Sequence, residues 1–243
     1  MVSIASFDVA TARGDDDSDH EQPDALIFDL DGTIVDSETV EYEAIRSVWA
    51  EHGVDYPAAR FVDVIGTTGH LGWLDQLEIE LGRTVDRSKS HRQHVDVHSR
   101  LTAALQPRDG IVALIDEAFA AGVPMAVASN SPRWWVQARV DAAGLAHALR
   151  TIVSVDDATA PKPDPAPFRE ACAALAVDPT SSVAFEDSST GVRSARAAGL
   201  YTVACAGPMS RGHDLSAADR VITSHTEITL AELGRALRVR RIR

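Results

Sequence analysis

Two carboxylates follow the first apolar run of the chain, where a buried strand would end. Asp29 and Asp31 come directly after residues 25–28 (ALIF), and Gly32 follows them. Acids at this spacing before a glycine are typical of a polar turn, of a metal-binding loop or of a reaction centre. This stretch alone does not distinguish the three.

Polar side chains follow later apolar runs in the same way. Ser129 and Asn130 follow the second run, Lys162 lies in the loop after the third, and Glu186 and Asp187 follow the fourth. The carboxyl ends of parallel strands meet at one edge of a sheet. We therefore expect these side chains to share one crevice with the first two carboxylates.

Four acids in one crevice repel one another unless a cation lies among them. The cation that best fits is Mg²⁺, a hard ion that prefers oxygen ligands. Lys162 and the hydroxyl and amide groups at 129–130 are suited to bind an anion. Together these groups favour phosphoryl transfer, in which positioning and charge balance are most of the task.

The elements that must position these residues alternate along the chain. Apolar runs suited to strands buried on both faces lie at 25–32, 123–131, 151–158, 182–189, 201–207 and 220–223. Helical patterns lie between most of them, at 112–121, 133–143, 167–176 and 189–198. This alternation predicts an α/β fold with a doubly wound parallel (Rossmann-like) sheet.

The interval between the first two strands is much longer than a crossover needs. Residues 38–107 have helical patterns, with apolar positions such as 40, 44, 45, 48 and 49. We predict a core domain made of 24–37 and 108–243, and an inserted α-helical cap domain over 38–107. The cap would lie over the carboxyl ends of the strands, where such sheets bind ligands. Residues 1–23 are acidic and are predicted to be a disordered tail.

The composition excludes several classes of protein. A net charge of −13 argues against a nucleic-acid partner. The chain has neither a run approaching the ~20 apolar residues of a membrane span nor a signal peptide. Cys172 and Cys205 stand alone in apolar segments, which favours reduced thiols and a cytoplasmic location. The oligomeric state stays open.

Four stretches resemble the motifs of the haloacid dehalogenase (HAD) superfamily, in order and at sensible spacings. They are DLDGTIVDS (29–37), VASNS (127–131), KPDP (162–165) and EDSSTG (186–191). The resemblance covers residues 24–225. The helical insertion looks like the cap of the β-phosphoglucomutase-like phosphatases.

The resemblance implies roles for the first motif. Asp29 would be the nucleophile that forms an aspartyl-phosphate. Asp31 would protonate the leaving alcohol and then activate water. Asp36 fits a structural role better than a chemical one.

The resemblance also implies a metal site and an anion site. Asp29, the backbone carbonyl of Asp31, Asp187 and Glu186 would hold Mg²⁺. Ser129, the amide of Asn130, and Lys162 would bind the phosphoryl oxygens.

Some relatives with other activities are excluded by single residues. Dehalogenases of the superfamily lack the second acid, which is Asp31 here, and P-type ATPases have a lysine where this chain has Leu30. A β-phosphoglucomutase has a cap histidine at the position of Glu41, and residues 64–73 lack the cations that would bind a second phosphate. Hydrolysis is therefore favoured, with His70 and Trp73 as candidate substrate contacts.

We predict a Mg²⁺-dependent phosphatase that hydrolyses a small phosphomonoester, such as a sugar phosphate, through an aspartyl-phosphate. A phosphomutase and a non-catalytic binding or scaffold protein are the alternatives. The sequence does not name the phosphorylated metabolite. His91, His94 and His98 share one helical face that we expect to be solvated.

Overall fold

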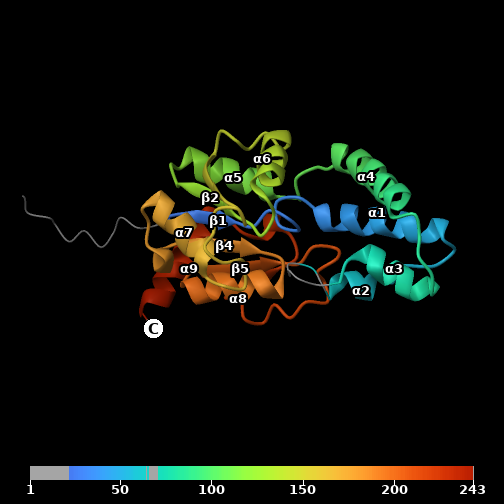
Figure 1. Ribbon diagram of the computed structural model, residues 1–243. Coiled ribbons are helices and arrows are strands. Elements are labelled where there is room, and N and C mark those ends of the chain that lie inside the picture. Colours follow the sequence, from blue (N-terminus) through green and yellow to red (C-terminus); the bar gives the residue numbers. More distant parts are fainter. Residues whose placement is uncertain (1–21, 64, 66–70, 243) are drawn as a thin grey trace, which may run out of the picture.

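A six-stranded parallel sheet forms the centre of the molecule in the computed structural model, which describes residues 22–63, 65 and 71–242 (Figure 1). The strands are β1 (Leu26–Phe28), β2 (Met125–Ala128), β3 (Leu149–Val153), β4 (Val183–Glu186), β5 (Tyr201–Cys205) and β6 (Arg220–Ile222). Their order is β3-β2-β1-β4-β5-β6, and all neighbours are parallel. The predicted doubly wound parallel sheet is confirmed.

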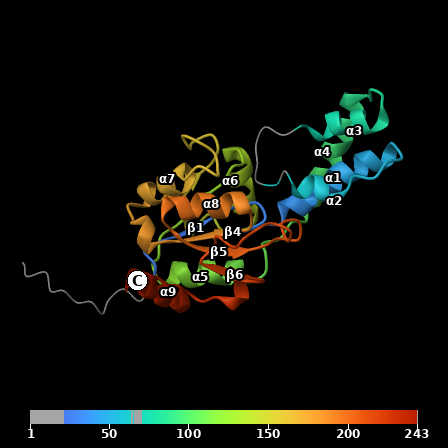
Figure 2. The ribbon, with the colours of Figure 1, turned by 90° about the horizontal axis from the view of Figure 1, so that it is seen from below.

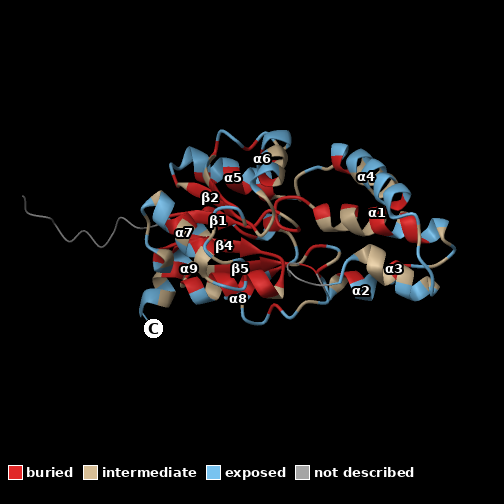
Figure 3. Ribbon diagram, in the orientation of Figure 1, coloured by how far each residue is buried: buried red, intermediate tan, exposed pale blue. Residues whose placement is uncertain are grey.

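Helices cover both faces of the sheet, which explains why its strands are continuously apolar. The helices of this part are α5 (Ile111–Ala120), α6 (Arg133–Ala142), α7 (Ala166–Leu175), α8 (Ser189–Ala198) and α9 (Leu230–Ile242). Leu26 and Phe28 of β1 pack in one buried cluster with α5, α6 and α9, whereas Ile27 packs in a second with α7 and α8. Figure 2 shows α5 and α9 below the sheet and α7 and α8 above it, and Figure 3 shows the strands buried between them.

Four further helices lie together beyond the carboxyl ends of the strands (Figure 1). They are α1 (Ser37–Glu51), α2 (Ala58–Val62), α3 (Trp73–Leu81) and α4 (Arg87–Ala103), called here the helical unit. The unit has its own buried cluster, which includes Val48, Trp49, Tyr56 and Leu77. A helical insertion between the first two strands is therefore present, as predicted.

The chain enters and leaves the helical unit through two neighbouring segments. Val35 and Pro107 form an antiparallel bridge, and the Arg108 N–H donates to the Ile34 carbonyl at 2.8 Å. At the entry, the Asp36 carboxylate accepts from the Thr39 N–H at 3.3 Å and caps α1. Asp36 thus has the structural contact that was expected of it.

Two further expectations concern membrane spans and the cysteines. Within the described ranges, every helix is too short or too polar to cross a bilayer. Cys172 and Cys205 are both buried, and neither forms a disulfide.

Candidate active site

Three carboxylates meet where β1 and β4 end. Asp29 follows β1, Glu186 ends β4 and Asp187 follows it, and all three are buried. One carboxylate oxygen from each lies within 4.8 Å of the others. The order of the strands reverses between β1 and β4, and open α/β sheets bind ligands at such a switch point.

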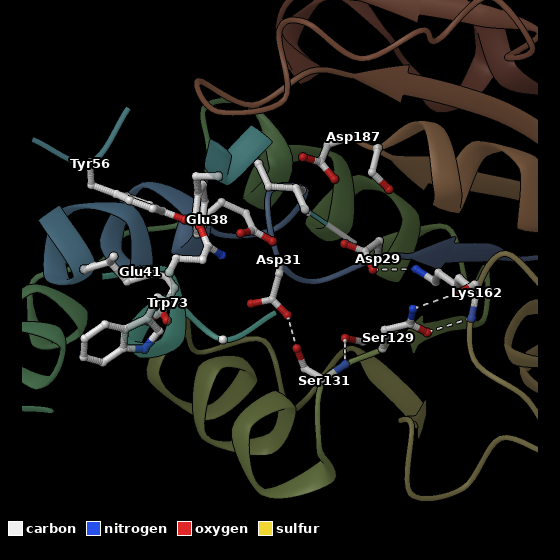
Figure 4. Close-up of a pocket in the computed structure, with 17 residues that line it drawn as sticks. Asp29, Asp31, Glu38, Glu41, Tyr56, Trp73, Ser129, Ser131, Lys162 and Asp187 are labelled. Carbon is white, nitrogen blue, oxygen red and sulfur yellow. Dashed lines mark hydrogen bonds and ion pairs between the residues drawn. The ribbon is translucent and has the colours of Figure 1, made fainter. Parts of the chain in front are cut away.

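A single buried lysine neutralises part of this charge. Lys162 Nζ lies 2.5 Å from Asp29 Oδ1 (Figure 4). It also lies 2.5 Å from Glu186 Oε1. The Asn130 side chain holds the backbone of Lys162 from both sides, accepting from its N–H at 2.8 Å and donating to its carbonyl at 3.2 Å. The Asn130 side chain therefore braces the lysine loop, a contact that its sequence motif did not predict.

Burial and like charge shift the ionisation of the acids. Burial raises the pKa of Asp29 well above its ordinary value, although Lys162 opposes this. Burial, and then the Glu186 carboxylate, raise the pKa of Asp187 to about 7. Burial disfavours the charged form of Lys162, but Asp29 and Glu186 outweigh it and raise the lysine pKa. The site is thus short of positive charge.

Glu186 has hydrogen-bond donors at both of its oxygens. Lys162 donates to Oε1, and the Ser188 hydroxyl donates to Oε2 at 3.2 Å. The backbone N–H groups of Asp187 and Ser188 also point to Oε2, at 3.2 and 3.4 Å. Asp187 Oδ2 accepts from the Ser210 hydroxyl at 2.7 Å, a partner that the motifs did not indicate.

Two motif glycines allow these carboxylates to pack against the backbone. Gly32 has a φ of +83°, and a Cβ there would lie 2.1 Å from Asp187 Oδ2. A Cβ on Gly191 would lie 1.9 Å from the Glu186 carboxyl carbon. A side chain at either position would therefore force the neighbouring carboxylate to move.

Asp31 lies outside the cluster of Asp29, Glu186 and Asp187 and is held by three donors. Ser37 Oγ lies 2.5 Å from Asp31 Oδ1, and the Trp135 indole N–H donates to the same oxygen at 2.9 Å. Ser131 Oγ lies 2.5 Å from Oδ2, and Figure 4 shows the Asp31 carboxylate turned toward it. Sequence reasoning missed all three donors, although Ser37 and Ser131 lie within quoted motifs.

Ser129 lies in the short segment between β2 and α6. Ser129 is buried, and its hydroxyl accepts from the Ser131 N–H at 3.0 Å. Its neighbours Asn130 and Ser131 contact the lysine loop and Asp31, so Ser129 lies in the segment that joins the two.

A cavity of about 290 Å³ joins this sheet edge to the helical unit. The sheet side contributes Asp29, Asp31, Ser129, Asn130, Lys162 and Asp187, and the helical unit contributes Glu38, Glu41, Tyr56, Trp73 and Gln76 (Figure 4). Trp73 thus lines the cavity. His70, the other candidate substrate contact, lies outside the described residues.

Glu38 is a cavity residue that sequence reasoning missed. Burial, and then the charges of Asp31 and Asp187, raise the pKa of Glu38 well above its ordinary value. Its position next to Ser37, in the first turn of α1, was the available signal.

The prediction of a solvated histidine face is wrong for two of its three residues. His91 is exposed, but His94 and His98 are half-buried and face Glu41, with Nε2–Oε2 distances of 3.0 and 3.7 Å. The His94 ring stacks on Trp73, with centroids 5.1 Å apart. Two rings of the polar helix α4 therefore contact Glu41 and Trp73, which line the cavity.

Comparisons with known proteins identify the family. The model of the haloacid dehalogenase-like hydrolases matches residues 26–205. The chain is 33% identical to protein CbbY of Rhodobacter capsulatus, over 80% of this chain and 90% of that protein. It is 32% identical to the fructose-1-phosphate phosphatase YqaB of Escherichia coli, over 76% of this chain and 97% of that protein.

A solved structure supports the same assignment. The crystal structure of CbbY from Rhodobacter sphaeroides in complex with phosphate has a TM-score of 0.69 and 30% identity to this chain. The match covers 87% of this chain and 99% of that one. The chain belongs to the haloacid dehalogenase-like hydrolase family, as its four motifs predicted.

Proposed function

We propose that this protein is a metal-dependent phosphatase that hydrolyses a small phosphomonoester through an aspartyl-phosphate on Asp29. The observation that carries the proposal is the separation of two neighbouring carboxylates into different surroundings. Asp29 lies beside Lys162 and two further acids, whereas Asp31 lies among hydroxyl and indole donors. Such a pair is suited to divide attack and proton transfer between its members.

The chemistry follows from these positions. An oxygen of Asp29 attacks phosphorus, and Asp31 gives its proton to the departing ester oxygen. Asp31 then takes a proton from the water that attacks the phosphorus of the aspartyl-phosphate. Inorganic phosphate is released, and both carboxylates return to their starting forms.

The carboxylate cluster fits a divalent metal ion. Asp29, Glu186 and Asp187 bring buried oxygens within 4.8 Å of one another, and burial, followed by the Glu186 charge, raises the pKa of Asp187. We propose that Asp29, Asp187 and the backbone carbonyl of Asp31 hold Mg²⁺. Because both Glu186 oxygens already accept hydrogen bonds, Glu186 contributes mainly charge or a water-mediated contact. A bound Mg²⁺ supplies charge neutralisation and orientation of the phosphoryl oxygens.

Three remaining polar groups are suited to bind a phosphoryl group. Lys162 and the Ser129 hydroxyl lie on the cavity wall, and the Asn130 N–H lies near the N-terminus of α6. We propose that these three groups stabilise the charge on the phosphoryl oxygens during transfer.

The helical unit is proposed to act as the cap that covers a bound substrate. It closes one side of the cavity with two acids, an amide and aromatic rings. Among the described residues that line the cavity, Lys162 is the only lysine or arginine, so a second phosphate has no cationic partner there. A leaving group rich in hydroxyls, such as a sugar, fits a wall of carboxylates and aromatic rings. The name of the fructose-1-phosphate phosphatase YqaB is consistent with this substrate class.

Phosphate release from a panel of phosphorylated metabolites tests the proposal. The expected result is release of phosphate that EDTA abolishes and Mg²⁺ restores. Borohydride reduction of the working protein should convert residue 29 to homoserine, the product expected from an aspartyl-phosphate. Asp29→Asn should abolish both signals, whereas Asp36→Asn, a change in the same motif that preserves the helix cap, should leave them.

Other outcomes would point elsewhere. Interconversion of sugar phosphates without release of phosphate would indicate a mutase. Absence of any turnover, with intact metal binding, would indicate a non-catalytic member of the family.

A further inference from the structure

Asp31 contacts one donor whose direction cannot reverse. The hydroxyls of Ser37 and Ser131 can each donate or accept a hydrogen bond, whereas the indole N–H of Trp135 can only donate. The Trp135 Nε1 atom lies 2.9 Å from Asp31 Oδ1. While this bond lasts, Oδ1 must act as an acceptor.

The other oxygen of Asp31 has no such restriction. Its partner is the Ser131 hydroxyl, at 2.5 Å, which can donate to an ionised Oδ2 or accept from a protonated one. The two oxygens of one carboxylate are therefore chemically unequal in this structure.

We propose that Trp135 is a positioning residue for proton transfer, because it reserves Oδ1 of Asp31 as an acceptor and leaves Oδ2 to carry the proton. This inference rests on the proposed phosphatase reaction. In its first half, Asp29 forms a bond to phosphorus and the bond from phosphorus to the ester oxygen breaks. The ester oxygen takes the proton from Asp31 Oδ2, and Asp31 is left ionised.

The Trp135 ring is held from both parts of the molecule. Arg139, one turn further along α6, places its guanidinium carbon 4.7 Å from the centre of the indole ring. From the helical unit, the His98 ring lies 5.4 Å from it, centroid to centroid. His98 also faces Glu41 at 3.7 Å. The indole is thus fixed by the core and by the proposed cap together.

The variant Trp135→Phe tests the proposal, because it removes the N–H and keeps an aromatic ring. Trp134→Phe is the matched control, since its neighbour Trp134 is 69% exposed. The readout is kcat/KM for p-nitrophenyl phosphate, which has a good leaving group, and for an alkyl phosphate, which needs protonation of its leaving oxygen.

We expect Trp135→Phe to lower kcat/KM for the alkyl phosphate about 10- to 100-fold, as for loss of a hydrogen bond to a charged group. The loss for p-nitrophenyl phosphate should be severalfold smaller, and Trp134→Phe should change neither value. An equal loss for both esters, or no loss, would overturn the proposal while leaving the phosphatase function intact.

A second measurement does not depend on turnover. Four indole N–H resonances are expected from the four tryptophans in an ¹H–¹⁵N spectrum, and Trp135→Phe identifies the relevant one. Asp31→Ala should move that resonance more than the other three, whose positions report that the variant is folded. An unmoved Trp135 resonance would overturn the pairing. A wild-type protein inactive on every ester would contradict the proposed function instead.

Discussion

Lys162 Nζ lies at hydrogen-bond distance from Asp29 and from Glu186, 2.5 Å from an oxygen of each, so that one buried ammonium group joins the ends of β1 and β4. The lysine comes from the loop after β3, at the far edge of this half of the sheet. Asn130, which follows β2, binds the backbone of this loop and so holds Lys162 near the strand ends that its ammonium group joins.

Replacing this lysine should affect both catalysis and stability. Lys162→Met leaves Asp29 and Glu186 buried without their cation, so we expect a loss of about 3–5 kcal/mol in the free energy of unfolding at pH 8 without metal. Phosphatase activity should fall by about 100-fold or more, since a preorganised charge is lost. The exposed Lys89→Met serves as control in urea unfolding and in phosphate release. Activity close to that of the unchanged protein would contradict the role of Lys162.

Gly191→Ala tests how tightly the carboxylate cluster is packed. Its Cβ would overlap the Glu186 carboxyl group, so that Glu186 must move and Lys162 loses one of its two partners. We expect a destabilisation of about 1–3 kcal/mol, as for overpacking, with weaker binding of Mg²⁺. Gly212→Ala is the control, because its Cβ would be 3.9 Å from the nearest atom, Val62 Cγ1. Thermal unfolding with and without Mg²⁺ measures both effects. Equal unfolding temperatures for Gly191→Ala and Gly212→Ala under both conditions would contradict this prediction.

The ring contact between His98 and Trp135 should matter for catalysis as well. His98→Ala removes an aromatic contact, which is typically worth about 0.5–1.5 kcal/mol, so we expect a loss of about 2- to 10-fold in kcat/KM for alkyl phosphates. His91→Ala, on an exposed position of the same helix, should leave kcat/KM unchanged. Equal kcat/KM values for the two variants would show that the helical unit does not act on catalysis through the His98 ring.

A buried histidine far from the proposed chemistry should govern stability in mild acid. Burial, and then the charge of Arg108, lower the pKa of His225 to about 4. The unfolded chain binds a proton at this residue below a pH of about 6.5, whereas the folded chain does not until about pH 4. The stability contributed by neutral His225 is therefore complete above about pH 6.5 and is lost as the pH falls toward 4.

Substitution of His225 should flatten this dependence. Between pH 6.5 and 4, the free energy of unfolding should fall by up to about 3 kcal/mol less in His225→Gln than in the unchanged protein. Urea unfolding at several pH values gives the slopes, and the exposed His147→Gln provides the comparison. Identical slopes in the two variants would exclude His225 as the source.

Local pattern was sufficient to predict the sheet. Each strand is a short apolar run ended by turn residues, and Gly122, Gly144 and Gly199 follow three of the helices with φ of +76°, +72° and +98°. The six strands and their parallel direction follow from such signals.

Contacts between distant segments could not be predicted in the same way. Trp135 and Asp31 are 104 residues apart, and Glu41 and His94 are 53 apart. The segment around His94 and His98 is so polar that solvent exposure was the natural expectation. These rings are covered by Glu41, Trp73 and Trp135, which belong to other helices. The local sequence around the histidines contains no signal of these contacts.

The bridge between Val35 and Pro107 places the two ends of the helical unit side by side. Closing the chain across that gap with a short turn would cost little loop entropy, and the sheet would keep its order. The half of the cavity wall that the helical unit contributes could therefore be exchanged as one segment, by recombination or by design, without rebuilding the acids at the strand ends. One catalytic core could in this way be fitted to many different phosphate esters.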